Sequence, residues 1–396
     1  MLYPLSLLFS IFLLVSVIEF TAFFVRLRFL KDMKITIALI PGDGIGPDII
    51  HEAVRVIDAV TMRFGHKVSY TTLTAGGKAI DQAGEPFPCE VLFECRRTNA
   101  VLSGPFGGPA WDSLPNSVRP ERALLELRKG LDLNASFRPV RFLQSLKNAS
   151  PLKDEILSHG FNFLIINELT SGIYNGERGL SVYGTSAWDT EHYTEDQICK
   201  VLRIACEAAR SRDKRLCLAD KANILESSRL WRDVMKSVSF DFPDINVEYL
   251  HINKACRLML RNPSRFDVIV TNTLFGDILT DIAGEMSGSI GLIPSGAVGE
   301  SGCPGLYGPL HGSAPHLEGK NSANPAAAIL SAALLLRHSL TLDEEALLIE
   351  RAVENVIAKG IRTYDLCSTN PDVYRNYRCV GTQAFCDEVL KEMDSL

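Results

Sequence analysis

Short apolar runs alternate with longer amphipathic stretches along this chain, and this alternation restricts its fold more than any other feature. The predicted strands are the apolar runs at 35–40, 163–166, 216–219 and 268–270. The predicted helices are the stretches at 47–64, 194–210, 324–340 and 343–359. Because strands that alternate with helices build layered sheets, the pattern predicts an α/β fold.

Length and composition limit the class of protein. The chain has 396 residues, 46% of them hydrophobic, which is enough for two domains with substantial cores. A net charge of −6 argues against a nucleic-acid partner, because nucleic-acid binding requires a basic face. None of the ten cysteines forms a C-x-x-C pair or a zinc spacing. Unpaired cysteines fit a reducing compartment, so we expect a cytoplasmic location.

Residues 1–32 differ from the rest of the chain. Between Leu5 and Val25 the only charge is Glu19, and about 20 apolar residues can span a bilayer. A signal peptide would carry positive charge before the apolar run, and none precedes this one. Met33 stands directly before the first predicted strand and is a plausible start. We therefore expect 1–32 to lie outside the native fold; a membrane anchor and a targeting segment are the alternatives.

An acidic row is the first candidate site. Asp277 and Asp281 are four residues apart, which places them one turn apart on one face of a helix, and Glu285 extends the row. Like charges at this spacing repel each other. A hard cation such as Mg²⁺ or Mn²⁺ would reverse that effect, because it takes carboxylate oxygens as ligands. The alternative is a solvated acidic face.

A glycine-rich turn follows the first strand, with the sequence Gly42-Asp43-Gly44-Ile45-Gly46-Pro47. A turn that opens a helix can bind an anion through its backbone amides. The Rossmann fingerprint, however, requires G-x-G-x-x-G and an acidic residue about 20 positions later. This turn has a different spacing, and the next strand region, 68–73, ends without an acid. A Rossmann site is disfavoured, and a tight turn with positive φ angles is the alternative to an anion site.

Arg119, Arg122, Arg128 and Arg138 fall in a short window. Arginine forks bind carboxylates through two parallel hydrogen bonds, so a small polycarboxylate is a natural ligand. Surface arginines are the alternative.

Other candidates lie in loops. Tyr174 lies in a glycine-rich stretch and Lys221 directly follows a predicted strand. Such a pair can donate and accept a proton, although either residue could be structural. The loop 311–315 has one ring, that of His311, among small residues, and suits a flat ligand.

The order of these segments resembles the β-decarboxylating dehydrogenases that act on isocitrate and isopropylmalate, and most closely the isopropylmalate branch. The segments that carry the resemblance are 40–47, 119–121, 124–129, 172–174, 220–223, 274–281 and 311–315. The likeness extends from about residue 34 to the C-terminus. Because several motifs are long and occur in order, the resemblance is specific.

The resemblance implies a two-domain α/β fold with a large mixed sheet, unlike a Rossmann fold. One domain would comprise 34–132 and 290–396 on the cofactor side. The other, 133–289, would bind metal and substrate and form a homodimer with shared active sites. The implied activity is the oxidative decarboxylation of the 2-hydroxy acid 3-isopropylmalate in leucine biosynthesis, with NAD and Mg²⁺ or Mn²⁺.

The resemblance also implies roles for particular residues. Asp277 and Asp281 would bind the metal together with Asn253 of the partner subunit, and Arg128 and Arg138 would hold substrate carboxylates. Tyr174 and, from the partner subunit, Lys221 would transfer protons. The expected lining of the isopropyl pocket is Glu121, Leu124, Leu125 and Ile224. The expected cofactor-binding residues are Asn223, His311, Gly312, Ser313, Ala314, His316 and Asn324.

Four departures from the family pattern lie in this site. Asn167 stands where the family has a substrate-binding arginine, a loss of about 2–5 kcal/mol in a buried pair. Asn253 stands where it has a metal-binding carboxylate, and Gly308 where it has a glutamate beside the nicotinamide. His316 replaces a ribose-binding aspartate, which leaves NAD and NADP both open. A related 2-hydroxy acid substrate and a weakened or inactive dimeric paralogue are therefore alternatives.

Overall fold

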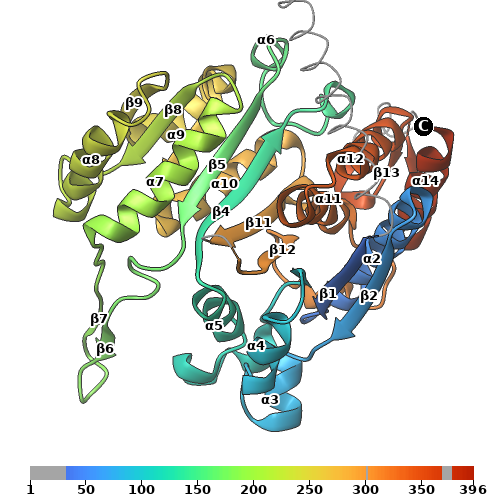
Figure 1. The fold of residues 1–396 in the computed structure, drawn as a ribbon, viewed down its shortest axis with the longest axis horizontal. Helices are drawn as coiled ribbons and strands as arrows, with labels where there is room; N and C mark the ends of the chain where they lie inside the picture. Colours follow the sequence, from blue (N-terminus) through green and yellow to red (C-terminus); the bar gives the residue numbers. More distant parts are fainter. Residues whose placement is uncertain (1–32, 300–301, 368–376) are drawn as a thin grey trace, which may run out of the picture.

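A mixed ten-stranded sheet runs through the computed structural model, which describes residues 33–299, 302–367 and 377–396 (Figure 1). From one edge to the other its strands are β2 (Lys67–Thr72), β1 (Lys34–Ile40), β3 (Ala100–Ser103), β12 (Gly305–Pro309), β11 (Pro294–Gly299), β4 (Leu133–Arg141), β5 (Asn162–Glu168), β10 (Val268–Thr271), β8 (Arg215–Asp220) and β9 (Asn246–His251). Two small ribbons are β6 (Arg178–Leu180) with β7 (Ala187–Asp189), and β13 (Ile361–Arg362) with β14 (Arg378–Cys379).

Twelve α-helices accompany these strands in the described ranges. They are α2 (Gly46–Phe64), α3 (Gly77–Ala83), α4 (Cys89–Cys95), α5 (Arg122–Gly130), α6 (Asp154–Leu157), α7 (Glu195–Arg210), α8 (Glu226–Ser239), α9 (Ile252–Arg261), α10 (Thr273–Ser287), α11 (Ala326–Leu340), α12 (Asp343–Ala358) and α14 (Thr382–Ser395).

The centre of the sheet is antiparallel and both flanks are parallel. Strand β4 pairs antiparallel with β5 and β11, and β11 pairs antiparallel with β12. The remaining pairs in this sheet are parallel. The chain crosses from the first half of the sheet to the second at β4 and returns at β11. This mixed topology confirms the predicted α/β fold and its difference from a Rossmann fold.

Alternate side chains of the strands enter different cores, since successive residues point to opposite faces of a sheet. Leu216 and Leu218 pack with α7 and α8, whereas Cys217 and Ala219 pack with α9 and α10. In the other half of the sheet, α2, α11, α12 and α14 cover one face and α4 and α5 the opposite face. Figure 1 shows α2 and α14 side by side, although they lie at opposite ends of the described chain.

The predicted elements are confirmed with small shifts at their ends. The helix expected at 194–210 is α7, which begins after Thr194 because the side chains of Thr194 and Gln197 form a reciprocal capping box. The helix expected from 324 begins only at Ala326, where the Asn324 side chain accepts a hydrogen bond from the Ala326 amide. In the described ranges, no helix is long and apolar enough to cross a membrane. The segment 1–32 lies outside those ranges.

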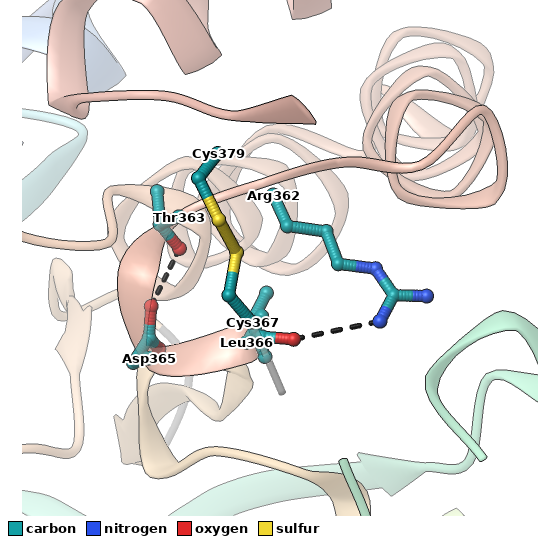
Figure 2. The surroundings of a disulfide bond; sticks show 6 residues. All are labelled: Arg362, Thr363, Asp365, Leu366, Cys367 and Cys379. Carbon is teal, nitrogen blue, oxygen red and sulfur yellow. Dashed lines mark hydrogen bonds between the residues drawn. A yellow bond between two sulfur atoms is a disulfide. The ribbon is translucent and has the colours of Figure 1, made fainter. Parts of the chain in front are cut away.

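The expectation that all cysteines are unpaired is wrong for two of them. Cys367 and Cys379 form a disulfide that closes a separation of 12 residues beside the β13–β14 ribbon (Figure 2). The spacing alone could not reveal this pair, because the pairing of β13 with β14 brings the two residues together. The other eight cysteines are free.

Breaking this disulfide is expected to lower the free energy of unfolding by about 3 kcal/mol, because a cross-link restricts the unfolded chain. The measurement is urea unfolding of Cys367→Ser against the parent protein, with and without reductant. Cys303→Ser, which changes an exposed free thiol, is the matched control. A parent protein whose stability is unaffected by reductant would contradict the prediction.

Candidate active site

The acidic row lies on α10, near the centre of the sheet. The Asn272 side chain caps this helix by accepting a hydrogen bond from the Phe275 amide at 2.9 Å. Asp277 accepts a hydrogen bond from the Tyr174 hydroxyl at 2.9 Å. Partial burial, and then the nearby Asp277 carboxylate, raise the pKa of Asp281. The pair therefore concentrates negative charge that a divalent cation would neutralise.

Arg138 of β4 reaches this row from the centre of the sheet. Its side chain is only 2% exposed, and its Nη1 lies 2.7 Å from Oδ1 of Asp277 and 3.2 Å from Oγ1 of Thr280. The Asn167 amide, with its oxygen turned toward the guanidinium, accepts hydrogen bonds from Nη1 at 3.0 Å and Nη2 at 3.3 Å. The buried Nε atom has no protein partner. Arg138 is thus held in place with one donor unused.

Arg128 of α5 lies close enough to Arg138 for the two charges to interact. Burial, and then the charge of Arg138, lower the pKa of Arg128 to about 10, so its guanidinium remains protonated at neutral pH. Its buried Nε also lacks a partner. An anion bound to both guanidiniums would relieve their repulsion. The arrangement therefore suits a carboxylate ligand.

Arg119 and Arg122 do not join this pair, which corrects the expected group of four arginines. Arg119 donates to the carbonyls of Leu114 and Asp112. Arg122 forms an ion pair with Glu126 one turn along α5. Arg119 and Arg128 are nine positions apart in the sequence, and the direction of α5 decides which guanidinium faces the acidic row.

A cavity of about 180 Å³ lies beside Arg128. Its lining includes Phe106, Glu121, Leu124, Arg128, Leu306, Gly308, Leu310, His311 and Gly312. The cavity therefore joins an apolar wall to a cationic group and to the 311–315 loop. Leu125 does not line it, and Ile224 is 65% exposed in a turn after β8, so a single chain does not bring either residue to the cavity.

The 311–315 loop is hydrogen-bonded to the glycine-rich turn. The carbonyl of Ser313 accepts a hydrogen bond from the Ile45 amide at 2.8 Å, and its hydroxyl donates to the Gly107 carbonyl at 2.7 Å. Ala314 has a φ of 37°, in a region that favours glycine, so the surrounding contacts must hold it there. Burial lowers the pKa of His311, whose Nε2 has no protein partner.

The glycine-rich turn itself is not an anion site. Gly42 and Gly44 have positive φ angles of 75° and 55°, and a Cβ at either would meet a backbone oxygen within 2.3 Å. The amides of Asp43, Ile45 and Gly46 already donate to protein carbonyls. The tight-turn interpretation is therefore correct, and the anion-binding hypothesis is wrong for these amides.

Sequence reasoning missed the role of Asp43. Its buried carboxylate accepts hydrogen bonds from the amides of Gly77, Lys78 and Gly107 at 2.9–3.1 Å. Asp43 thereby joins its own turn to the first turn of α3 and to the loop that contains Gly107. The only local signal was a charged residue between two glycines.

The remaining cofactor candidates, Asn324, His316 and Asn223, differ in burial and do not form one cluster. Asn324 is buried and donates to Asp365 at 2.9 Å, and Asp365 also accepts from the Ser289 hydroxyl at 2.5 Å. His316 is exposed in a 3₁₀ turn, Pro315–Leu317. Asn223 is exposed in the turn after Lys221, so it belongs to a different cluster.

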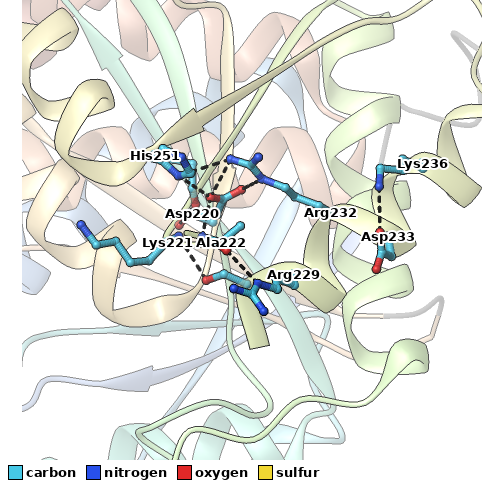
Figure 3. A network of polar contacts seen from close by, with 11 residues as sticks. Asp220, Lys221, Ala222, Arg229, Arg232, Asp233, Lys236 and His251 are labelled. Carbon is cyan, nitrogen blue, oxygen red and sulfur yellow. Dashed lines mark hydrogen bonds and ion pairs between the residues drawn. The ribbon is translucent and has the colours of Figure 1, made fainter. Parts of the chain in front are cut away.

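Lys221 and Asn253 form this second cluster, at the ends of β8 and β9. The Lys221 ammonium donates a hydrogen bond to the Asn253 side chain. Figure 3 shows the Lys221 side chain directed away from Asp220 and Arg232. The polar contacts of Asp277, by contrast, are with Arg138 and Tyr174. A single chain thus presents two separate groups of predicted site residues.

Tyr174 is expected to remain protonated well above neutral pH. Burial, and then the Asp277 carboxylate, raise the pKa of Tyr174 from 10.0 to about 12. The stability that this shift contributes is present below pH 10 and is lost as the pH rises toward 12. Ultraviolet titration of Tyr174→Phe against the parent protein should show the loss of one late-titrating tyrosine. Loss of a tyrosine that titrates near 10 would contradict the assignment.

No group of three or more Asp, Glu, His or Cys side chains in the described ranges could hold a metal. Asp277 and Asp281 alone fit a divalent cation only in part, since hard cations take six or more oxygen ligands and draw the remainder from water, substrate or another chain.

Known proteins share this fold and order of motifs. The sequence model of the family described as isocitrate/isopropylmalate dehydrogenase matches residues 36–389. The 3-isopropylmalate dehydrogenase of Clostridium acetobutylicum is 44% identical over 366 residues, covering 92% of this chain and 100% of that protein. That of Aquifex aeolicus is 43% identical over 368 residues, covering 92% and 98%. The crystal structure of isocitrate dehydrogenase from Methylococcus capsulatus has a TM-score of 0.77 at 31% identity, covering 90% and 99%.

The chain therefore belongs to the isocitrate/isopropylmalate dehydrogenase family and is an oxidoreductase. This confirms the resemblance that the sequence motifs indicated.

Proposed function

We propose that the protein catalyses the metal- and NAD-dependent oxidative decarboxylation of (2R,3S)-3-isopropylmalate to 2-oxo-4-methylpentanoate in leucine biosynthesis. The observation that carries this proposal is the pair of neighbouring guanidiniums of Arg128 and Arg138 beside Asp277. The names of the relatives support the same activity.

The cavity favours an alkyl malate as the substrate. Arg128 and Arg138 would hold carboxylate oxygens, while Leu124 and Phe106 face an alkyl group. A third carboxylate, as in isocitrate, would meet this apolar wall without a partner, and burying an unpaired charge is costly. Glu121, on the same lining, would repel it further.

The proton transfers are assigned to Lys221 and Tyr174. Lys221 must first lose a proton to solvent, and as the neutral amine it then accepts the proton of the C2 hydroxyl. Tyr174 later donates its hydroxyl proton to the carbon that has lost carbon dioxide. The raised pKa of Tyr174 suits a donor that must keep its proton until that step. A divalent cation, which Asp277 and Asp281 would hold in part, would supply Lewis-acid stabilisation, and NAD⁺ would be the hydride acceptor. The cofactor role is proposed for the 311–314 loop, His316, Asn223 and Asn324.

A homodimer with shared active sites would bring the two clusters together. In a single chain, Lys221 and Asn253 contact each other but not Asp277. The β6–β7 hairpin projects from the body of the molecule (Figure 1), and its large apolar side chains are exposed. These side chains are Leu180, Val182, Tyr183 and Trp188. Burial of such a surface by a second copy is a physical reason for dimerisation.

The proposed domains are 34–132 with 290–396 and 133–289. Their support is the division of the buried cores, since residues around α2 and α11 pack apart from those around α7 and α10. A cytoplasmic location also remains a proposal. The Cys367–Cys379 disulfide favours an oxidising compartment, so subcellular fractionation is the test.

The direct test is NADH formation by the purified protein with 3-isopropylmalate, NAD⁺ and Mn²⁺. Parallel reactions contain NADP⁺, isocitrate or other alkyl malates, and one contains a chelator. Turnover on 3-isopropylmalate that requires the metal would support the proposal. A folded dimer without activity on any of these substrates would refute it.

One observation favours a second candidate, an enzyme with a changed substrate or weakened activity. Asn167 stands where the family has an arginine. Its side chain packs so closely against Gly276 that a Cβ on that glycine would lie 1.9 Å from the side-chain amide. If the native site lacks a needed cation, Asn167→Arg should raise kcat/KM on 3-isopropylmalate by roughly 30-fold or more. A fall in kcat/KM, with unchanged folding, would show instead that the site is adapted to asparagine. Asn253→Asp tests the second departure in the same assay.

A further inference from the structure

Arg232 of α8 forms an ion pair with a buried carboxylate at the end of β8. Asp220 is only 3% exposed, and Arg232 places Nε 2.5 Å from its Oδ2 and Nη2 3.0 Å from its Oδ1. A guanidinium fork on a carboxylate fixes direction as well as distance. The end of β8 is therefore tied to α8.

Asp220 and α8 in turn hold the backbone around Lys221. Asp220 accepts a hydrogen bond from the Ala222 amide at 2.9 Å, and Ser228 of α8 accepts one from the Lys221 amide at 3.1 Å. The Lys221 carbonyl accepts from the amides of Ile224 and Leu225, both at 2.9 Å. The main chain of Lys221 is thus restrained on both sides (Figure 3).

The same guanidinium reaches the neighbouring strand. Its Nη2 lies 3.4 Å from Nδ1 of His251, the residue that pairs with Asp220 in the β8–β9 register. Arg232 also lies over the Tyr249 ring, 5.6 Å from its centre. Asn253 follows His251 by two residues, and its amide accepts the hydrogen bond of Lys221. One side chain therefore connects the strand ends that carry Lys221 and Asn253.

We propose that Arg232 is a positioning residue that sets the place of the Lys221 amine relative to Asn253. It acts by clamping the C-terminal ends of β8 and β9, and its own contacts are with Asp220, His251 and Tyr249. The inference rests on the proposed function, in which Lys221 accepts a proton from the substrate. A misplacement of about 1 Å at such a group can cost roughly 10²-fold in rate.

The first experiment compares Arg232→Gln with the parent protein in steady-state kinetics. We expect kcat to fall by about 10²-fold while KM for the hydroxy acid changes little, because Arg128 and Arg138 are untouched. Lys236→Ala is the matched control. Lys236 lies on the same helix, and its ion pair with Asp233 is exposed (Figure 3), so kcat should not change. A higher KM with unchanged kcat in Arg232→Gln would overturn the proposal.

A double-mutant cycle tests whether Arg232 acts through Asp220. The effects of Asp220→Asn and Arg232→Gln should not multiply, and the double variant should be no slower than the slower single variant. If the two effects on kcat multiply, Arg232 does not act through Asp220, and this part of the proposal is refuted. Arg232→Lys keeps a positive charge beside Asp220 but cannot form the two parallel hydrogen bonds of a guanidinium. It replaces Arg232→Gln in this test if that variant does not fold. Its kcat should lie between those of the parent protein and Arg232→Gln.

A measurement without turnover separates this proposal from the proposed function. Lys221 is labelled with an amine-selective reagent and its modification rate is followed by peptide mass spectrometry, with exposed Lys254 as the internal reference. Arg232→Gln should raise the Lys221 rate several-fold, because the amine leaves Asn253, while Lys236→Ala should not. An unchanged Lys221 rate overturns the positioning role. An altered rate in a protein that turns over no substrate supports positioning and refutes the proposed reaction.

Discussion

Replacement of Lys221 by alanine is expected to lower kcat by about 10³-fold, within the range that a positioned proton acceptor contributes. The amine lies at the end of β8, where its backbone is restrained and its ammonium contacts Asn253. Lys221 contacts Asn253, whereas Arg138, a proposed substrate-binding residue, contacts Asp277, so KM should change much less than kcat. Steady-state kinetics with 3-isopropylmalate measures both quantities.

Lys254→Ala is the matched control for this variant. Lys254 is exposed on α9, directly after Asn253. Its replacement by alanine removes the same charge from the same part of the molecule. Folding and dimerisation of both variants are checked by thermal unfolding and sedimentation. Retention of most of the activity by Lys221→Ala would refute the assignment of Lys221 as the proton acceptor.

Replacement of Arg138 by glutamine is expected to lower kcat/KM by roughly 30-fold to several thousand-fold, because losing one partner of a charge pair buried on binding costs about 2–5 kcal/mol. The side chain is almost wholly buried and contacts Asp277 at 2.7 Å. Its loss removes a proposed substrate-binding group and leaves Asp277 without its cationic neighbour. Both effects act on the same reaction, so kcat/KM is the parameter to measure.

Arg122→Gln provides the comparison for Arg138. Arg122 forms an ion pair with Glu126 on the surface of α5, and exposed pairs contribute about 0–1 kcal/mol. We expect this variant to keep its activity and nearly all of its stability. Equal losses in the two variants would mean that the burial of Arg138 and its contact with Asp277 do not explain its effect.

Local features of the site could be predicted from the sequence. The four-residue spacing of Asp277 and Asp281 places them on one helix face wherever the helix lies, because that geometry depends on the backbone alone. The strand β1 and the helix α7 were predicted for the same reason, since apolar periodicity and capping residues are local signals. The order of motifs also indicated the family correctly.

Contacts between distant segments could not be predicted in this way. Arg138 and Asp277 are 139 positions apart, and the pairing of β4 with β5 and the packing of α10 bring them together. The disulfide between Cys367 and Cys379 depends on the β13–β14 ribbon. The three hydrogen bonds that Asp43 accepts require its turn, the start of α3 and the loop at Gly107 to meet, which periodicity does not report.

The sequence by itself determined the α/β class, several of the helices and strands, and the family, because these follow from periodicity and from ordered motifs. Only the tertiary structure decided which arginines face the acidic row, which loops close on the cavity and how Arg232 connects Lys221 to Asn253. The reason is physical: side-chain spacing within one element is set by local backbone geometry, whereas contacts between elements depend on how the whole sheet and its helices pack.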